Sequence, residues 1–453
     1  MAKPKLALIP STVGASVYSV LPSNGDGDFN FTRSSAATRI NAQGLIETVA
    51  VGDNRLNYPL LDGRVQTCPH LLLEPQRTNL ITYSEDFSNA YWTKTGSTIT
   101  SNAAISPDGT LNADKLVENT STGQHNKTAV LGSSPNAYSF SVYAKSLSGN
   151  RYLQLRMANN ISGSIVAKFD LDNGTLVYGT TLFGSGYSVN SSEIIALSDG
   201  WYKCSISGNK TDAVGNNNIQ TQLSSTTSIS EVDSYTGDGT SGVYIWGAQV
   251  EEGSYPTSYV VSNSGSATTR LAEVCDGSGN ASTFNDSEGV LMVDIDFSYT
   301  ELNRYITISD GTNSNRVIIG TESSLNLIRG YVIVGGNIQC QISYTLSDIT
   351  ISHKILIKYK LNDFALWIDG FEVGTDTSGT TPIGMSELAF DNGVGLGDFY
   401  GKTKQLQYFD SALTDSELET LTSWMSFSDM AIDLNYTIPV SYTHLTLPTI
   451  LLV

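Results

Sequence analysis

The sequence predicts an all-β fold: two antiparallel β-sandwich (jelly-roll) domains after an extended N-terminal segment, with one short helix near the C-terminus. Apolar and polar side chains alternate with a period of two over two long blocks, 79–262 and 286–428, as they do in strands with one buried face. The chain contains 41 Gly and only 15% charged residues, which suits short strands joined by tight turns. Because no helices intervene between the strands, we expect antiparallel sandwiches.

Residues 1–78 form the extended N-terminal segment, which has weak periodicity and many turn signals. Its strand-like pieces are too scattered to build a core of their own. The stretch FTRSSAATRINAQGLIE, 31–47, contains Arg33 and Arg39, a run of small residues and little bulky apolar material. We therefore expect the segment to lie as a strap in a groove of a neighbouring domain or subunit.

The first block, 79–262, contains regular alternation in YSFSVYAKS, 138–146, and in RYLQLRM, 151–157. This pattern predicts one buried and one solvated face, with four side chains on the solvated one: Tyr143, Tyr152, Gln154 and Arg156. The pair Asn173-Gly174 predicts a hairpin with a two-residue type I′ turn. Trp201 and Trp246 lie in alternating strands and are expected in the core.

A small, polar segment, 263–285, is expected to link the two blocks. In the second block, 286–428, FALWIDGFEVG predicts a hairpin with Asp369-Gly370 as its turn, so that Trp367 faces Glu372. Trp367 then lies on the face opposite Leu366 and Ile368. The segment LTDSELETLTSWM has a Thr414 to Glu417 capping box and helical spacing, which predicts a helix near 414–425.

Composition excludes several classes of function. Lys and Arg total 25 against 44 Asp and Glu, a formal net charge of −19, and such a field repels a nucleic-acid backbone. The four cysteines, at 68, 204, 275 and 340, are too far apart for a metal knuckle or redox pair, so we expect buried thiols, with a single bridge left open. The apolar end of the C-terminal tail is far below the ~20 residues of a membrane span, so we expect no membrane insertion.

No catalytic or metal motif is recognisable. Asp294 and Asp296 share one strand face, which we interpret as a solvated face rather than a catalytic pair. A catalytic site assembled from distant residues stays open. Acidic turns such as 170–174 and 309–313 offer oxygen ligands for calcium, but Asp and Asn are also the default turn residues. We expect no cofactor and assign no metal ligands, leaving calcium open and unassigned.

Outward-facing aromatic residues beside hydrogen-bonding groups are the best candidates for a binding site. Trp367 with Glu372, and Tyr143 with Tyr152, Gln154 and Arg156, are therefore predicted to bind glycan. An inter-subunit interface would use the same residue types.

Several long phrases over about residues 1–270 resemble bacteriophage virion proteins of the tail-fibre and appendage type. These phrases are MAKPKLALIP, VYSVLPSNGDGDFNFTRSSAATRINAQGLIETV, RLNYPLL, CPHLLLEPQRTNLITYSEDFSNAYW and YIWGAQVEEGSYPTSYVVSNSGSATTR. The first sandwich is similar to carbohydrate-binding-module jelly rolls. The second, with KILIKYKLNDFALWIDG and FYGKTKQLQYFDSALTDSELETL, resembles concanavalin A-like or laminin-G-like lectin domains.

The resemblance implies a non-enzymatic virion protein that adheres to host surface polysaccharide. It implies a homo-oligomer assembled with other virion proteins, and an N-terminal segment used for attachment to the virion. Two alternatives stay open: a capsule or exopolysaccharide depolymerase, acting as a glycoside hydrolase or lyase, and a purely structural virion subunit without a ligand. Assembly would take place in the host cytoplasm.

The C-terminal tail, 429–453, differs from the rest of the chain. Its last part, PVSYTHLTLPTILLV at 439–453, resembles translated sequencing-adapter read-through, so we expect it to be an artefact without a functional role.

Overall fold

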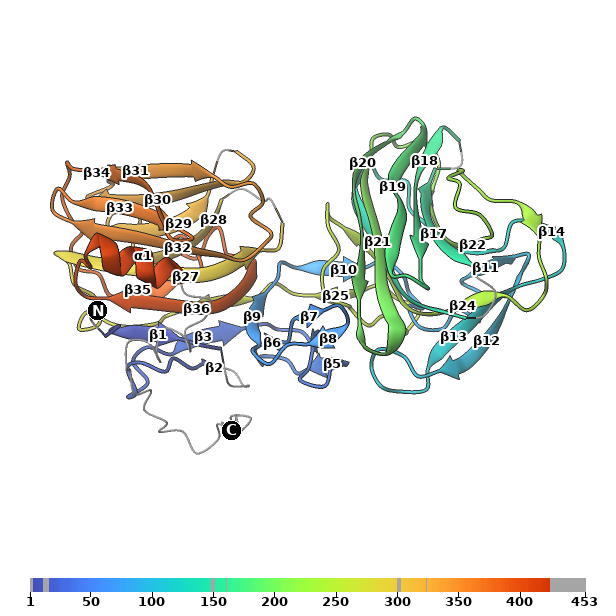
Figure 1. The fold of residues 1–453 in the computed structure, drawn as a ribbon, viewed down its shortest axis with the longest axis horizontal. Coiled ribbons are helices and arrows are strands. Elements are labelled where there is room, and N and C mark those ends of the chain that lie inside the picture. The colour runs from blue at the N-terminus through green and yellow to red at the C-terminus, as the bar shows by residue number, and fades with distance from the viewer. Residues whose placement is uncertain are drawn as a thin grey trace.

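The computed structural model describes residues 3–10, 16–147, 151–159, 161–299, 303–322 and 324–423. Two β-sandwiches lie side by side, with the N-terminal strands below the second sandwich and between the two (Figure 1). The predicted all-β class is confirmed, and the α-helix of the described residues lies near the C-terminus as expected. The predicted tail, 429–453, and the artefact expected within it at 439–453, lie outside the described residues.

The first sandwich packs two six-stranded antiparallel sheets face to face. The first, which we call the polar sheet, consists in order of β11 (Thr93–Thr95), β15 (Asn126–Leu131), β22 (Asn217–Ser224), β17 (Tyr152–Ala158), β18 (Gly163–Asp170) and β19 (Thr175–Gly184). The other, the junction sheet, consists of β12 (Ser97–Ala104), β13 (Ala113–Glu118), β24 (Gly242–Glu252), β16 (Asn136–Ser146), β21 (Trp201–Lys210) and β20 (Tyr187–Ala196). Their inner faces bury Phe140, Leu155 and Ile206. A short pair, β14 (Thr122–Gly123) and β23 (Tyr235–Thr236), lies beside them.

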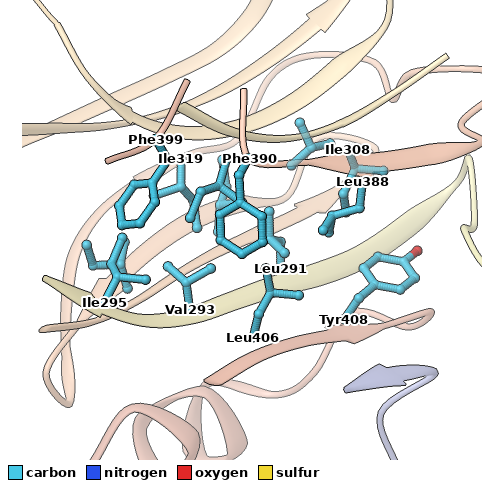
Figure 2. Close-up of a cluster of buried hydrophobic side chains, with 14 of the residues drawn as sticks. Leu291, Val293, Ile295, Ile308, Ile319, Leu388, Phe390, Phe399, Leu406 and Tyr408 are labelled. Atoms are coloured by element: carbon cyan, nitrogen blue, oxygen red, sulfur yellow. The ribbon is translucent and has the colours of Figure 1, made fainter. Parts of the chain in front are cut away.

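The second sandwich packs an eight-stranded sheet on a five-stranded one. The eight-stranded covered sheet consists of β34 (Phe371–Asp376), β33 (Phe364–Ile368), β32 (His353–Lys360), β27 (Glu288–Phe297), β36 (Gly401–Phe409), β9 (His70–Leu73) and β6 (Leu56–Asn57), with β1 (Leu6–Leu8) also paired to β36. The platform sheet consists of β31 (Asn337–Thr345), β30 (Leu327–Val334), β29 (Arg316–Thr321), β28 (Arg304–Ser309) and β35 (Glu387–Ala389). Figure 2 shows the core between them, where Leu291, Val293 and Ile295 of β27 lie beside Leu406 and Tyr408 of β36.

The outer face of the covered sheet carries a third layer. Helix α1 (Asp415–Ser423) begins after Thr414, whose backbone N–H donates to Glu417 Oε2 at 2.9 Å, as the capping box predicted. Leu418 and Leu421 of the helix pack against Met292 and Trp367 of the sheet. The helix was expected to reach residue 425, and the positions after Ser423 lie outside the described residues.

The N-terminal segment contributes to both sandwiches. The expected domain boundaries place residues 1–78 outside the second sandwich, whereas β1, β6 and β9 are strands of its covered sheet. The remaining short strands form small sheets: β2 (Ser16–Val17) and β3 (Phe29–Thr32) with β26 (Val274–Asp276), β4 (Ala37–Ile40) with β5 (Ile46–Val49), β7 (Leu60–Leu61) with β8 (Arg64–Val65), and β10 (Arg77–Asn79) with β25 (Thr268–Arg270). Ile46 of β5 packs with Trp201 and Tyr259 against the outer face of the junction sheet.

A buried cluster of charged side chains holds these segments together. Arg33 Nη1 lies 2.8 Å from Glu273 Oε1, Arg55 Nη1 lies 2.8 Å from Glu74 Oε2, and Arg270 Nη1 lies 2.8 Å from the same Glu74 oxygen. Although burial opposes it, Arg270 and Arg55 hold the pKa of Glu74 well below its usual range. The arginine-bearing N-terminal stretch therefore supplies charge to a shared core that it could not form alone.

Two turn predictions have different outcomes. Asp369 and Gly370 both have positive φ, 50° and 86°, and Ile368 pairs with Phe371, so the two-residue turn is confirmed. The hairpin at Asn173-Gly174 exists, but Asp170 pairs with Thr175 and leaves a four-residue loop. The type I′ assignment is wrong because the Asp170 carboxylate accepts the backbone N–H groups of Asp172 and Asn173, which stabilises the longer loop.

The described cysteines are free thiols. Cys204, Cys275 and Cys340 are buried as expected, and burial raises the pKa of each. Cys68 is exposed, so the prediction of a buried thiol is wrong at that position. It lies in a loop between β8 and β9 rather than in a strand, so no sheet covers it.

Candidate functional site

The predicted exposure of Trp367 is wrong. The strand register is as expected, because Trp367 pairs with Glu372 and Glu372 is exposed. Trp367 itself is only 6% exposed and packs with Leu418 and Leu421. The reason is that α1 covers the outer face of the sheet, so a side chain on the face opposite Leu366 is still buried.

The predicted exposure of Tyr143 is also wrong. Tyr143 lies on the outer face of the junction sheet, where it is 4% exposed, and its ring contacts those of Trp246 and Tyr259. The N-terminal segment and residues 255–259 cover this face. Trp201 and Trp246 are buried, as predicted.

Gln154 and Arg156 lie on the outer face of the polar sheet and are buried there. Residues 225–234, which we call the strap loop, cross this face. Gln154 Nε2 donates to Ser230 O at 3.3 Å, and Arg156 Nη2 lies 2.6 Å from Glu231 Oε1. The predicted solvated face is therefore wrong at both positions. Tyr152 is half-buried, and Tyr143 belongs to the other sheet, so the predicted four-residue site is not assembled.

The Lys168 ammonium group on this face has acceptors from the strap loop and from the neighbouring strand β22. Lys168 Nζ lies 2.8 Å from Asp233 Oδ2 and donates to Ser224 Oγ at 2.7 Å and Thr226 O at 3.0 Å. The ammonium group of Lys168 is therefore fully engaged within the chain and is not available to a ligand.

The interpretation of Asp294 and Asp296 as a solvated face is wrong as well. Both side chains are buried on the outer side of the covered sheet. Asp294 Oδ1 accepts from Ser352 Oγ at 2.6 Å, and burial raises the pKa of Asp296. Among the described residues, no group of three or more His, Cys, Asp or Glu side chains is placed to hold a metal ion. The same part of the chain contains no helix long and apolar enough to cross a membrane.

The platform sheet, by contrast, has an outer face that is only partly covered: Ile318, Tyr331 and Ile333 are buried, whereas Asn313, Ile338 and Gln341 are exposed. It carries a shallow depression of about 470 Å³ lined by aromatic, basic and amide side chains over an apolar floor. Ile318 of β29 pairs with Tyr331 of β30, which pairs with Gln341 of β31. Directly paired residues share a face, so these three side chains form a row across the sheet. We call this surface the platform face: Tyr305, Asn313, Arg316, Ile318, Glu322, Arg329, Tyr331, Ile333, Ile338, Gln341 and Asn392.

Two glycines make room for the ring of Tyr305. Tyr305 pairs with Gly320, where an added Cβ would approach its Cδ1 to 2.4 Å. At Gly397 an added Cβ would approach its Cδ2 to 2.7 Å. The ring therefore lies close against backbone at both positions, which holds it in place at the edge of the depression.

Tyr331 is fixed by a charged pair. Arg329 Nη1 donates to Glu322 Oε2 at 2.6 Å and to the Tyr331 hydroxyl at 2.7 Å, and that hydroxyl in turn donates to Glu322. Burial, followed by the Glu322 carboxylate, raises the pKa of Tyr331 to about 12. The phenol therefore stays protonated near neutral pH and keeps one orientation.

Other groups on the platform face have unused hydrogen-bonding capacity. Arg316 Nη1 donates to Asn392 O at 2.8 Å and its Nε is buried, so Nη2 is the donor of this side chain that a ligand can reach. Within the described ranges, no carboxylate lies within ion-pair distance of Arg316, and the exposed amides of Asn313 and Gln341 have no side-chain partner. A fixed aromatic ring beside free donors is an arrangement that can stack on a sugar ring and bind its hydroxyls.

These residues were missed although the sequence contained the signal. The alternation in RYITIS, RVIIGT and LIRGYVIV, beginning at residues 304, 316 and 327, places Tyr305, Arg316 and Tyr331 opposite the core.

No family model matches the chain, and no curated protein matches it in sequence. Similar solved structures include the CBM40 domain of a Ruminococcus gnavus IT-sialidase bound to α2,3-sialyllactose, at 13% identity and a TM-score of 0.28, covering 32% of this chain and 87% of that one. Domains LG4-5 of the mouse laminin α1 chain have 10% identity and a TM-score of 0.20, covering 65% and 89%. The tail fibre protein gp63.1 of an E. coli phage has 11% identity and a TM-score of 0.22, covering 76% and 42%.

Proposed function

We propose that this protein is a non-enzymatic bacteriophage tail-fibre or appendage subunit that adheres to host surface polysaccharide through the platform face. The observation that carries the adhesion proposal is the open face itself, where Tyr305 is held beside the uncommitted donors of Arg316 and Gln341. The virion proposal is supported by the phrases in residues 1–270 that resemble tail-fibre and appendage proteins.

A binding measurement on purified protein tests the adhesion proposal. Immobilised host polysaccharides would be screened by biolayer interferometry, and the strongest ligand titrated against Tyr305→Ala. Loss of a stacking aromatic should weaken binding by about 1–3 kcal/mol. Tyr344→Ala is the matched control, because Tyr344 is an exposed tyrosine of β31 outside the platform face. Equal losses in both variants, or none in Tyr305→Ala, would contradict the proposal.

The non-enzymatic proposal requires a separate assay. Incubation of the protein with the polysaccharide that it binds should release no reducing ends and no unsaturated sugars. Release of either product would identify a hydrolase or a lyase instead. Co-purification with phage particles and light scattering of the purified chain test the proposed virion location and the proposed homo-oligomer.

A further inference from the structure

A second cavity lies where the N-terminal segment and both sandwiches meet. It has a volume of about 450 Å³, within the usual range of ligand pockets, about 300–1,000 Å³. We call it the junction cavity. Its walls come from β4, from β16, β20 and β21 of the junction sheet, from residues 255–259, and from the second sandwich through Tyr299 and Lys402.

Two donors with unused capacity lie next to each other in this cavity. Tyr143 of β16 and Lys203 of β21 are directly paired, so their side chains are neighbours on the outer face of the junction sheet. Tyr143 is only 4% exposed, yet its hydroxyl has no hydrogen-bond partner among the described residues. Lys203 Nζ donates to Thr257 O at 2.7 Å, and no carboxylate of the described chain lies within ion-pair distance of it.

The nearby acidic groups are already engaged or lie at the rim. Glu74 accepts from arginines and from Ser258, and Glu251 accepts from the backbone N–H and hydroxyl of Thr257. Glu193 is exposed at the rim. Burial lowers the pKa of Lys203, and an anion bound beside it would offset that desolvation.

The cavity also has an aromatic wall. The rings of Tyr255 and Tyr299 stack at a centroid distance of 4.9 Å and an interplanar angle of 13°, one from the connector after the first sandwich and one from the second sandwich. Lys402 lines the same side, with its side chain 42% exposed. Tyr255 is buried between Tyr299 and the Arg77 guanidinium, so the half-buried ring of Tyr299 supplies the apolar surface for a pyranose ring, beside donors suited to a carboxylate.

We infer that the junction cavity is a second binding site, separate from the platform face, for a sugar that bears a carboxylate. The carboxylate accepts from the Tyr143 hydroxyl and the Lys203 ammonium, while Glu193 at the rim accepts from ring hydroxyls. Because residues of the N-terminal segment, the first sandwich and the second sandwich all line the cavity, a bound sugar bridges the two sandwiches. The inference does not depend on adhesion through the platform face.

Calorimetric titration of the full chain with trigalacturonate, and with neutral trigalactose as the comparison, tests this inference. Trigalacturonate should bind at least about tenfold more tightly, since a hydrogen bond to a charged group is worth that much. Tyr143→Phe removes only the hydroxyl and should weaken trigalacturonate binding about tenfold without shifting the thermal unfolding midpoint. Lys203→Gln keeps a donor for Thr257 O and should remove the preference for the acidic sugar.

The outcomes separate the two sites. If Lys203→Gln does not fold, Tyr143→Phe and the trigalactose comparison still decide the question. Absence of trigalacturonate binding, equal binding of both sugars, or full binding by Tyr143→Phe would overturn the inference. So would trigalacturonate binding that is lost in Tyr305→Ala but kept in Tyr143→Phe, because that ligand would then occupy the platform face.

Discussion

The polar sheet of the first sandwich and the platform sheet of the second both direct polar side chains away from their cores. The two outer faces differ in whether another segment of the chain covers them. The strap loop supplies carbonyl and carboxylate acceptors to Lys168, Gln154 and Arg156. No such loop crosses the platform face in the described residues, and the amides of Asn313 and Gln341 stay exposed there without a side-chain partner. A polar sheet face can serve as a binding surface only when its donors are left uncommitted.

The outer face of the covered sheet is also buried by another element, here through apolar side chains of a helix. Its outer face would be a second exposed surface without α1, which buries Trp367 together with Met292. An aromatic residue on the outer side of a strand is therefore part of the proposed ligand-binding face in one sheet and part of a third layer in the other. The following predictions test this contrast, beginning with the largest effect.

Trp367→Ala should lower the free energy of unfolding by about 3–5 kcal/mol, the cost of emptying a large buried site. Chemical denaturation followed by circular dichroism measures the change. Glu372→Ala is the matched control, because its exposed side chain faces Trp367 across the hairpin and should contribute little. A loss below about 1 kcal/mol for Trp367→Ala would show that α1 does not cover this face in solution.

Lys168→Met should lower the free energy of unfolding by about 2–3 kcal/mol. Breaking a fully buried ion pair costs about 3–5 kcal/mol, and we expect less here because Asp233 keeps its hydrogen bond from the Ser230 hydroxyl. Hydrogen exchange of residues 225–234 should accelerate, since the ammonium group holds the strap loop at Thr226 O and Asp233. Unchanged exchange in this segment would show that the strap loop is held by other contacts.

His353→Gln should change the pH dependence of stability, with a smaller effect than either substitution above. The hydrogen bond that the imidazole donates to the Asp369 carboxylate, opposed by burial and aided by a second bond donated to Asp348 O, raises the pKa of His353 above 6.5. The wild-type contribution is therefore fully present below the unfolded pKa, about 6.5, and is lost as the pH rises through the folded value.

Urea denaturation at several pH values between about 5.5 and 8.5 brackets the unfolded histidine pKa and tests this sign. The wild-type chain should lose more stability than His353→Gln as the pH increases. His70 is present in both proteins, and its pKa, lowered well below 6.5 mainly by burial, gives the opposite slope. Parallel curves for the two proteins would contradict the proposed His353 to Asp369 interaction.

Gln341→Ala should change the free energy of unfolding by no more than about 0.5 kcal/mol, as for other surface substitutions. Gln341 is exposed, and its side chain has no hydrogen-bond partner in the described part of the chain. Thermal unfolding beside the polysaccharide titration measures both properties. If stability falls by more than about 2 kcal/mol, the residue supports the sheet and the platform face is not the free surface described above.

The sequence by itself determined the local features of this protein. Period-two alternation was enough to place Phe140 and Leu155 in a core, because side-chain direction in a strand is a property of the backbone. The Asp369-Gly370 turn and the Thr414 to Glu417 cap followed from short-range conformational preferences and hydrogen bonds. The same alternation also specified that the side chains of Tyr305, Arg316 and Tyr331 point away from the core of the second sandwich.

Only the tertiary structure decided which outer faces stay exposed. Tyr143, Gln154 and Trp367 point away from their sandwich cores, as predicted, but segments distant in sequence cover each of them. Likewise, Arg33 finds its partner Glu273 across 240 positions of chain. Alternation specifies the direction of a side chain relative to its own sheet, whereas burial depends on every other segment that packs there, and that information is absent from any local stretch of sequence.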